Sequence, residues 1–255
     1  RTSAPRARMP ATLAAGTTVL ENCAREPEID NLVDVLIAYG ASIEGRGTSQ
    51  LTIEGRKRLQ GAEVSIIGDR IEAGTYLCAA MMTRGKVRAT GIRAEWLEST
   101  LAVMRQMGAK VEAGEDWIEV SAPDVLKGIE VTTAPYPGFP TDMQAQIMAV
   151  ATVANGTSIL TETIFENRFM HVPELVRMGA KIRARGNQAI VEGVSQLKGA
   201  PVMATDLRAS ASLVLAGLAA QGTTKVRRIY HLDRGYDALE ARRQGLGASI
   251  RRLQE

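Results

Sequence analysis

Gly138 to Val153, with the sequence Gly-Phe-Pro-Thr-Asp-Met-Gln-Ala-Gln-Ile-Met-Ala-Val-Ala-Thr-Val, is the stretch that decides the fold. A polar turn ends at Thr141-Asp142, and a run rich in Ala, Met, Ile and Val follows it. A run of good helix formers that is apolar on every side predicts a buried helix. Thr and Asp are suitable N-cap residues for the start of that helix.

The same arrangement occurs twice more in the chain. Asp69-Arg70 precedes an apolar run from 71 to 82, and Asp206 to Arg208 precedes another from 209 to 220. Two glycine marks recur with the same period of about seventy residues, which indicates one structural unit used repeatedly. The first mark is Gly-Ala-[Ser/Lys]-[Ile/Val], at Gly40, Gly108, Gly179 and Gly247; the second is Gly-[Thr/Lys], at Gly16, Gly85, Gly156 and Gly222.

The elements between these marks follow one order. A short strand is expected after the second mark, at 86–89, 157–160 and 223–226, and an amphipathic helix ends at the first mark. Two further strands are expected to close the unit, for example 118–120 and 129–131, joined through Leu126–Gly128. The sequence therefore predicts an α/β protein of repeated βαβαββ units. We expect residues 1–67 to be the rear of one domain and residues 68–255 to hold three such units.

Composition excludes several classes of protein. The 255 residues include 45% hydrophobic and 23% charged residues and have a net charge of +3. Aromatic residues make up 4%, too few for base-stacking platforms, so we expect no nucleic-acid partner. No apolar run reaches the roughly 18 residues of a membrane span, and no secretory signal is visible, which favours a cytoplasmic protein. With Cys23 and Cys78 far apart and two histidines in all, we expect no metal site.

Charged residues near the helix starts are candidates for an anion site. Helix starts present unpaired N–H groups and a positive dipole end, and Arg70, Arg168, Arg208 and Arg234 lie in or after the corresponding turns. The alternative is that these arginines form structural salt bridges with neighbouring aspartates. Asp142 is either a helix cap or, beside an anion site, a general base.

Seven segments resemble the UDP-N-acetylglucosamine enolpyruvyltransferases, a branch of the EPSP synthase family, and the resemblance runs from about Ala11 to the end of the chain. These segments are Ala24–Ile29, Asp69–Thr75, Gly114–Ile118, Phe139–Gln146, Phe165–Leu175, Met203–Ser212 and Arg228–Gly235. The family fold is an inside-out α/β barrel of two domains, each with three βαβαββ units. The chain is similar to the end of the first domain and most of the second.

The resemblance implies transfer of the enolpyruvyl group of phosphoenolpyruvate to the 3-hydroxyl of UDP-N-acetylglucosamine, with release of phosphate. This is the first committed step of peptidoglycan synthesis, and it needs no metal or organic cofactor. Asp142 is implied to accept the proton of that hydroxyl, since an unassisted hydroxyl is a poor nucleophile. The other implied substrate-binding residues are Thr141, Ile164 and Phe165 for the nucleotide-sugar, Arg208 and Arg234 for phosphoenolpyruvate, and Arg168, Asp206, Asp69, Arg70, Glu26 and Glu28 for the cleft lining.

Other interpretations stay open. The family's Lys-Asn pair and its loop with a proton-donating Cys are not found in this sequence, and neither Cys23 nor Cys78 lies in such a loop motif. The chain would then be a non-catalytic fragment, or a half that works with a partner supplying the first domain, and we expect little activity from it alone. The shikimate-pathway enolpyruvyltransferase shares the fold, but the motifs at Phe139 and Phe165 match the nucleotide-sugar enzyme better.

Overall fold

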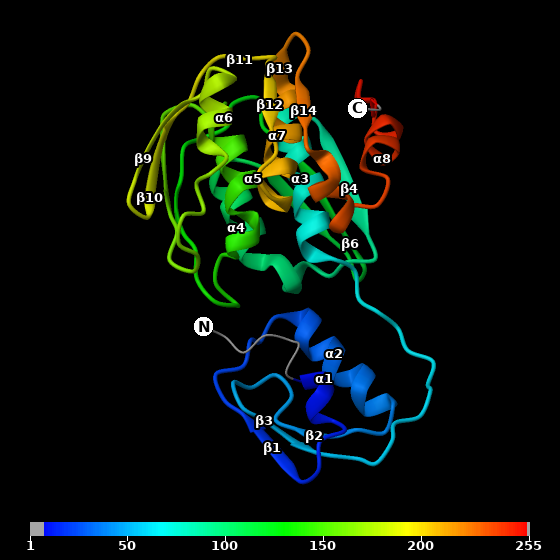
Figure 1. Ribbon diagram of the computed structural model, residues 1–255. Helices are drawn as coiled ribbons and strands as arrows, with labels where there is room; N and C mark the ends of the chain where they lie inside the picture. Colours follow the sequence, from blue (N-terminus) through cyan, green and yellow to red (C-terminus); the bar gives the residue numbers. More distant parts are fainter. Residues whose placement is uncertain (1–7, 254–255) are drawn as a thin grey trace. The chain divides into compact units, whose positions relative to one another are not determined.

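The computed structural model describes residues 8–253, which form two compact units. The first unit comprises residues 8–69 and 135–137, and the second comprises the rest of the described chain. The predicted first region, 1–67, begins outside the described residues. The elements, drawn in Figure 1, are α1 (Arg8–Ala11), β1 (Thr17–Leu20), α2 (Pro27–Ala38), β2 (Ser42–Glu44), β3 (Leu51–Glu54), α3 (Arg70–Thr83), β4 (Lys86–Thr90), η2 (Ala94–Leu97), α4 (Glu98–Gln106), β5 (Lys110–Ala113), β6 (Trp117–Ser121), β7 (Glu130–Thr132), α5 (Thr141–Ala151), β8 (Thr157–Thr161), α6 (Val172–Arg177), β9 (Lys181–Arg185), β10 (Gln188–Glu192), β11 (Leu197–Lys198), β12 (Pro201–Met203), α7 (Leu207–Ala219), β13 (Ala220–Gln221), β14 (Lys225–Arg227), η3 (Ile229–Arg234) and α8 (Leu239–Gly245).

The first unit is an antiparallel sheet of order β1-β3-β2 with the helix α2. Leu51 and Ile53 alternate with more exposed residues along β3 and are 2% and 0% exposed, so one face of the sheet is buried. Val33 of α2 packs against Leu51 in a small core. Glu26 is the N-cap of α2 and Pro27 follows it in the first turn, where the N–H that proline lacks has no partner within a helix.

The centre of the second unit consists of the three helices that the apolar runs predict. α3, α5 and α7 pack against one another, and Figure 1 shows strands on the outside of this group. Residues 143–151 of α5 are all buried, so the helix has no solvent-facing side beyond its first two residues. A helix that is apolar all round is stable only when other elements surround it, and the neighbouring helices and sheets do so here.

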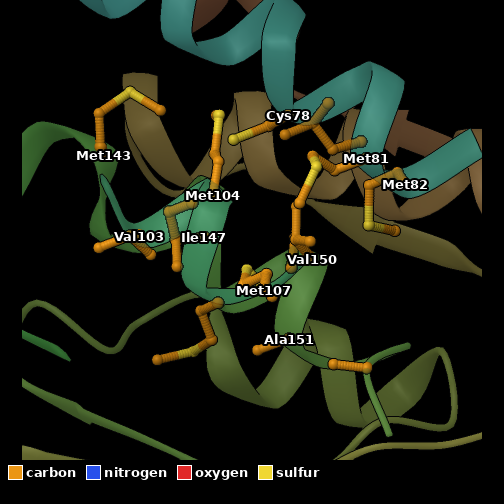
Figure 2. Close-up of a cluster of buried hydrophobic side chains, with 14 of the residues drawn as sticks. Cys78, Met81, Met82, Val103, Met104, Met107, Met143, Ile147, Val150 and Ala151 are labelled. Carbon is orange, nitrogen blue, oxygen red and sulfur yellow. The ribbon is translucent and has the colours of Figure 1, made fainter. Parts of the chain in front are cut away.

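Methionines fill much of the space between these helices (Figure 2). Met81, Met104 and Met107 are 0% exposed, and Met143 is 1% exposed. At Gly74 of α3, an added Cβ would lie 2.9 Å from the sulfur of Met143, so α3 and α5 approach closely at this point. Flexible thioether side chains adapt to such irregular gaps, and the close contact places the start of α5 firmly against α3.

The repeat is visible in the glycine positions. Gly108 follows α4 and Gly179 follows α6, with φ of +102° and +92°, a region that favours glycine. In both places the glycine N–H and the next N–H donate to carbonyls of the preceding helix. An antiparallel hairpin comes next in each case, β5–β6 and β9–β10. The two glycines therefore occupy equivalent places, as their spacing predicts.

One strand assignment from the sequence is wrong. The hairpin that closes a unit is β5–β6, directly after the Gly-Ala mark, and not a pair made of 118–120 and 129–131. β7 instead pairs in parallel with β8 and opens the next unit, in a sheet of order β7-β8-β10-β9. A parallel pair needs a crossover, and α5 provides it. Residues 130–192 show all six elements of a βαβαββ unit; the described residues before and after them show only some, so three complete units stay a prediction.

Candidate functional site

The site forms where α5 begins, beside the carboxyl ends of the parallel strands β7 and β8. Pro140 is the N-cap of α5, while Thr141 and Asp142 lie in the first turn. The expectation that Thr141 or Asp142 caps the helix is therefore wrong. Because the cap position is taken by proline, the Asp142 carboxylate is available for other partners, and an acidic group in a first turn is favoured by the helix dipole.

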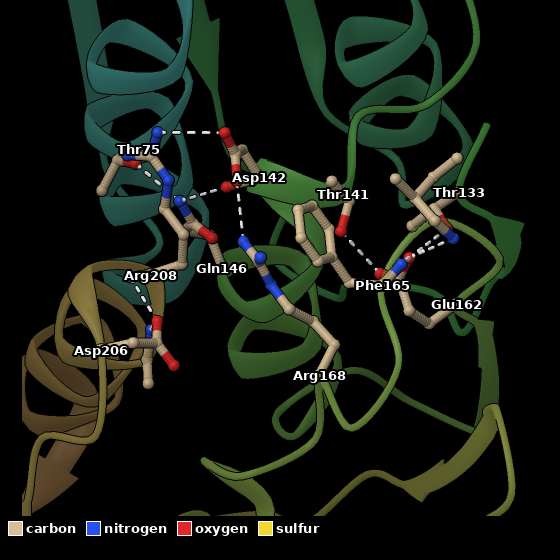
Figure 3. Close-up of polar contacts among 12 residues, drawn as sticks. Thr75, Thr133, Thr141, Asp142, Gln146, Glu162, Phe165, Arg168, Asp206 and Arg208 are labelled. Atoms are coloured by element: carbon tan, nitrogen blue, oxygen red, sulfur yellow. Dashed lines mark hydrogen bonds and ion pairs between the residues drawn. The ribbon is translucent and has the colours of Figure 1, made fainter. Parts of the chain in front are cut away.

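Asp142 lies between two arginines that come from distant parts of the sequence (Figure 3). Nη2 of Arg168, in the loop after β8, is 2.7 Å from Oδ1, and Nη2 of Arg208, in α7, is 3.2 Å from Oδ2. The side chain of Asp142 is 41% exposed, whereas those of Arg168 and Arg208 are 19% and 15% exposed. The three residues thus form a partly buried charged cluster in which the carboxylate stays partly exposed to solvent.

Two opposing influences act on the Asp142 carboxyl. Its burial is the largest and raises the pKa, but the charges and hydrogen bonds of Arg208 and then Arg168 outweigh it and hold the pKa below its usual value of 3.8. The pKa of Arg208 is raised, because Asp142 and Tyr236 more than offset its own burial. With both arginines in place, Asp142 is ionised and weakly basic.

Local structure holds Arg208 in position. Asp206 is the N-cap of α7, and its Oδ1 accepts from the backbone N–H groups of Arg208 and Ala209 at 2.8 and 2.9 Å. The structure thus confirms that Asp206 caps the helix. Arg208 lies in the first turn of α7, on the side of that helix that meets the start of α5.

A second set of polar contacts holds the backbone of Asp142. The Gln146 amide, one turn further along α5, donates to the Asp142 carbonyl at 2.9 Å and to Thr75 Oγ1 at 3.1 Å. Thr75 Oγ1 is also 2.9 Å from the Tyr236 hydroxyl. Gln146 and Thr75 are fully buried, so these bonds are sheltered from water.

The loop after β8 presents the residues expected to hold a nucleotide-sugar. Ile164 and Phe165 are 40% and 54% exposed, and the guanidinium of Arg168 lies 4.9 Å from the centre of the Phe165 ring. The backbone N–H groups of Ile164 and Phe165 donate inward to Glu162. A backbone contact between this loop and a substrate would therefore use carbonyl oxygens. A cavity of about 340 Å³ adjoins the loop, between residues 165–169 and the turn at Gly186-Asn187.

The remaining predicted residues lie on other segments of the described chain. Arg234 is exposed in η3 and, within the described residues, forms no ion pair with Asp142. Arg70 is buried at the start of α3. Glu26, Glu28 and Asp69 belong to the first unit.

Sequence reasoning missed Glu162, Thr133 and Gln146. Glu162 follows the apolar strand β8 directly, and a charged residue at the end of a buried strand, just before a candidate loop, was the available signal. Gln146 lies inside a run otherwise read as apolar core, and its spacing of one helical turn from Asp142 was the corresponding signal.

Other chemistry-bearing side chains are packed away. Cys23 and Cys78 are buried and form no disulfide, and His171 is 1% exposed beside α6. Over residues 8–253, no group of His, Cys, Asp and Glu side chains is arranged to hold a metal ion. None of the helices in the same range is long and apolar enough to cross a membrane.

Comparison with known proteins identifies the family of the chain. The family profile described as EPSP synthase (3-phosphoshikimate 1-carboxyvinyltransferase) matches residues 8–242. The chain belongs to the EPSP synthase family. Within this family, the chain is 58% identical over 245 residues to the UDP-N-acetylglucosamine 1-carboxyvinyltransferase of Sphingopyxis alaskensis, covering 96% of this chain and 57% of that protein. It is 56% identical to the protein of the same name from Shewanella frigidimarina, covering 96% of this chain and 59% of that protein.

Two solved structures match the fold. The enolpyruvyl transferase NikO from Streptomyces tendae superposes with a TM-score of 0.84 and 30% identity, over 96% of this chain and 59% of that one. EPSP synthase from Acinetobacter baumannii gives a TM-score of 0.75 at 19% identity, over 99% of this chain and 62% of that one, a likeness of fold alone. The chain thus spans less than two thirds of the length of each of these relatives.

Proposed function

We propose that the chain takes part in transferring the enolpyruvyl group of phosphoenolpyruvate to the 3-hydroxyl of UDP-N-acetylglucosamine, with release of phosphate. The observation that supports this most is Asp142, held between Arg168 and Arg208 at the start of α5. Relatives that are 56–58% identical and bear the name of this activity support the choice of substrate. The setting we propose is peptidoglycan synthesis in the cytoplasm.

The charges of the cluster suit the two substrates. Phosphoenolpyruvate brings a phosphate and a carboxylate, and guanidinium groups bind both in a planar, forked geometry. We assign Arg208 and Arg234 to this anion. Ile164, Phe165 and Thr141 are assigned to the nucleotide-sugar, because Thr141 is next to Asp142 in the chain and the other two expose apolar surface on the loop that leads to Arg168.

Asp142 must gain basicity before it can accept a proton. In the ligand-free chain both carboxylate oxygens are held by arginines, which lowers the pKa of Asp142. An anionic substrate that draws Arg208 away would raise that pKa and free Oδ2 for the sugar hydroxyl. Asp142 would then take the hydroxyl proton as the oxygen forms its bond to C2 of phosphoenolpyruvate, while an acid supplied by the first domain protonates C3. Loss of phosphate and of a C3 proton completes the transfer.

Several features remain part of the proposal. They are the inside-out barrel of the family, three repeat units from residue 68, and a substrate cleft with Asp206, Asp69, Arg70, Glu26 and Glu28 in its lining. The relatives are longer than this chain, so the complete reaction is proposed for the chain together with a first domain that supplies the second wall of the cleft. The alternative is a fragment that binds the nucleotide-sugar without turnover.

Phosphate release and ligand binding test the proposal together. We expect the 255-residue chain to bind UDP-N-acetylglucosamine in titration calorimetry, and Asp142→Asn to weaken that binding. We expect phosphate release from phosphoenolpyruvate to be slow with the chain alone, and to rise when the amino-terminal domain of the Sphingopyxis alaskensis relative is added. Shikimate 3-phosphate in place of the nucleotide-sugar serves as the control. Absence of nucleotide-sugar binding, or release that depends on shikimate 3-phosphate, would contradict the proposal.

A further inference from the structure

Glu162 is a buried carboxylate with an unusual number of partners. The residue is 3% exposed and follows β8 directly. Its Oε1 accepts from Thr133 Oγ1 at 2.8 Å, from the Ile164 N–H at 2.8 Å and from the Phe165 N–H at 3.0 Å. Its Oε2 accepts from Thr141 Oγ1 at 2.8 Å. All four partners are hydrogen-bond donors, which matches a side chain that, when ionised, only accepts.

No cation compensates this charge among the residues that the structure describes. Burial of a carboxylate is costly unless hydrogen bonds replace the lost water, and here two hydroxyls and two backbone amides do so. A neutral amide or an apolar side chain could not accept four donors. The environment is therefore built for a carboxylate.

The four donors come from the three segments that form the candidate site. Thr133 directly follows β7, Thr141 precedes Asp142 at the start of α5, and Ile164 and Phe165 lie in the loop that leads to Arg168 (Figure 3). Thr133 strengthens the link, because its Oγ1 also accepts from the Thr163 N–H at 2.8 Å. The two members of the Asp142–Arg168 pair thus lie on segments that the same carboxylate holds.

We propose that Glu162 is a positioning residue that holds the 163–165 loop and the start of α5 in the arrangement that binds the nucleotide-sugar. Glu162 acts through its neighbours, since its side chain is buried and both of its oxygens are occupied. The part that concerns the nucleotide-sugar rests on the proposed function; the part that concerns the loop does not.

The chain offers a matched control in Glu119. This glutamate of β6 is 6% exposed, but its partners are Lys86 and Arg88, and it contacts none of the site segments. Glu119→Ala removes a buried carboxylate elsewhere in the same unit. Comparing Glu162→Ala and Glu162→Gln with Glu119→Ala separates a local effect on the loop from a general loss of stability.

Amide hydrogen exchange tests the positioning role without any substrate. The N–H groups of Ile164 and Phe165 are the reporters, measured relative to the amides of β10 in the same protein. We expect exchange at both reporters to be about tenfold faster or more in Glu162→Ala, because two hydrogen bonds to a charged acceptor are lost. Glu162→Gln should give an intermediate rise of about fivefold, since a neutral acceptor is weaker. Glu119→Ala should leave the ratio unchanged.

Titration with UDP-N-acetylglucosamine then tests the link to the substrate. We expect Glu162→Ala to weaken binding about tenfold, Glu162→Gln to restore part of it, and Glu119→Ala to have no effect. Unchanged reporter exchange in a folded Glu162→Ala, or in Glu162→Gln if the alanine variant does not fold, would overturn the proposal. Faster exchange with unchanged binding would overturn its substrate part. If the unsubstituted chain binds no nucleotide-sugar, the proposed function fails, while the exchange ratio still decides the role of Glu162.

Discussion

Replacing Asp142 with asparagine isolates the energy of the charged cluster. The substitution keeps the size of the side chain but removes the negative charge between Arg168 and Arg208. The asparagine oxygen can still accept from one guanidinium, whereas its NH₂ group would face the donors of the other. Two positive charges would then share the start of α5 without a counter-charge.

The expected loss of stability follows from burial. A hydrogen bond to a charged group contributes about 1.5–3 kcal/mol where it is fully sheltered, and an exposed ion pair about 0–1 kcal/mol. The arginines are largely buried but the Asp142 side chain is 41% exposed, so water screens both contacts. We therefore expect Asp142→Asn to lower the free energy of unfolding by about 2 kcal/mol at pH 7.

The pH dependence has a defined sign. The pKa of Asp142 is lowered in the folded chain, so its ionised carboxylate stabilises the fold. This stabilisation is fully present at a pH above the usual carboxyl pKa of 3.8, and it is lost as the pH falls through the pKa of the folded chain. Urea denaturation of both proteins at pH 7 and near pH 2.5 measures this, with the exposed Asp124→Asn as control. A variant as stable as the parent at pH 7, or a difference that persists unchanged at pH 2.5, would refute this account of the cluster.

Three further predictions concern stability. Asp206→Ala should lower the free energy of unfolding by about 1 kcal/mol in urea denaturation, as expected for a lost N-cap. Asp206→Asn should keep most of the parent's stability, because asparagine is also a good N-cap. Burial is the largest cause that lowers the pKa of His171 to about 4. The free energy of unfolding should therefore fall by up to about 3 kcal/mol as the pH drops from 6.5 to 4. In urea denaturation at several pH values, His171→Asn should remove this dependence on pH. Met104→Ala should cost about 2–5 kcal/mol in urea denaturation, since the side chain is fully buried among the central helices, and a loss under 1 kcal/mol would contradict that packing.

The sequence by itself determined the repeat and its central helices. Gly108 and Gly179 recur at the spacing of the repeat because a helix ends at each of them in a conformation that glycine adopts readily. This requirement is local, so it can be recognised from the sequence. The run from Met143 to Val153 predicts a buried helix for a similar reason, since an element that is apolar on all sides has no stable exposed form. The cap at Asp206 and the helix start at Glu26-Pro27 are likewise local features.

Only the tertiary structure decided which charged residues meet. Asp142, Arg168 and Arg208 are brought together because β8 runs beside β7 and α7 packs on α5, contacts between segments far apart in the chain. Glu162 went unnoticed for the same reason: its four donors lie before and after it in sequence, and their convergence depends on the parallel pairing of β7 and β8. The pairing partner of β7 could not be read from its own residues, because a short apolar strand fits a hairpin and a parallel pair equally well until its neighbours are in place.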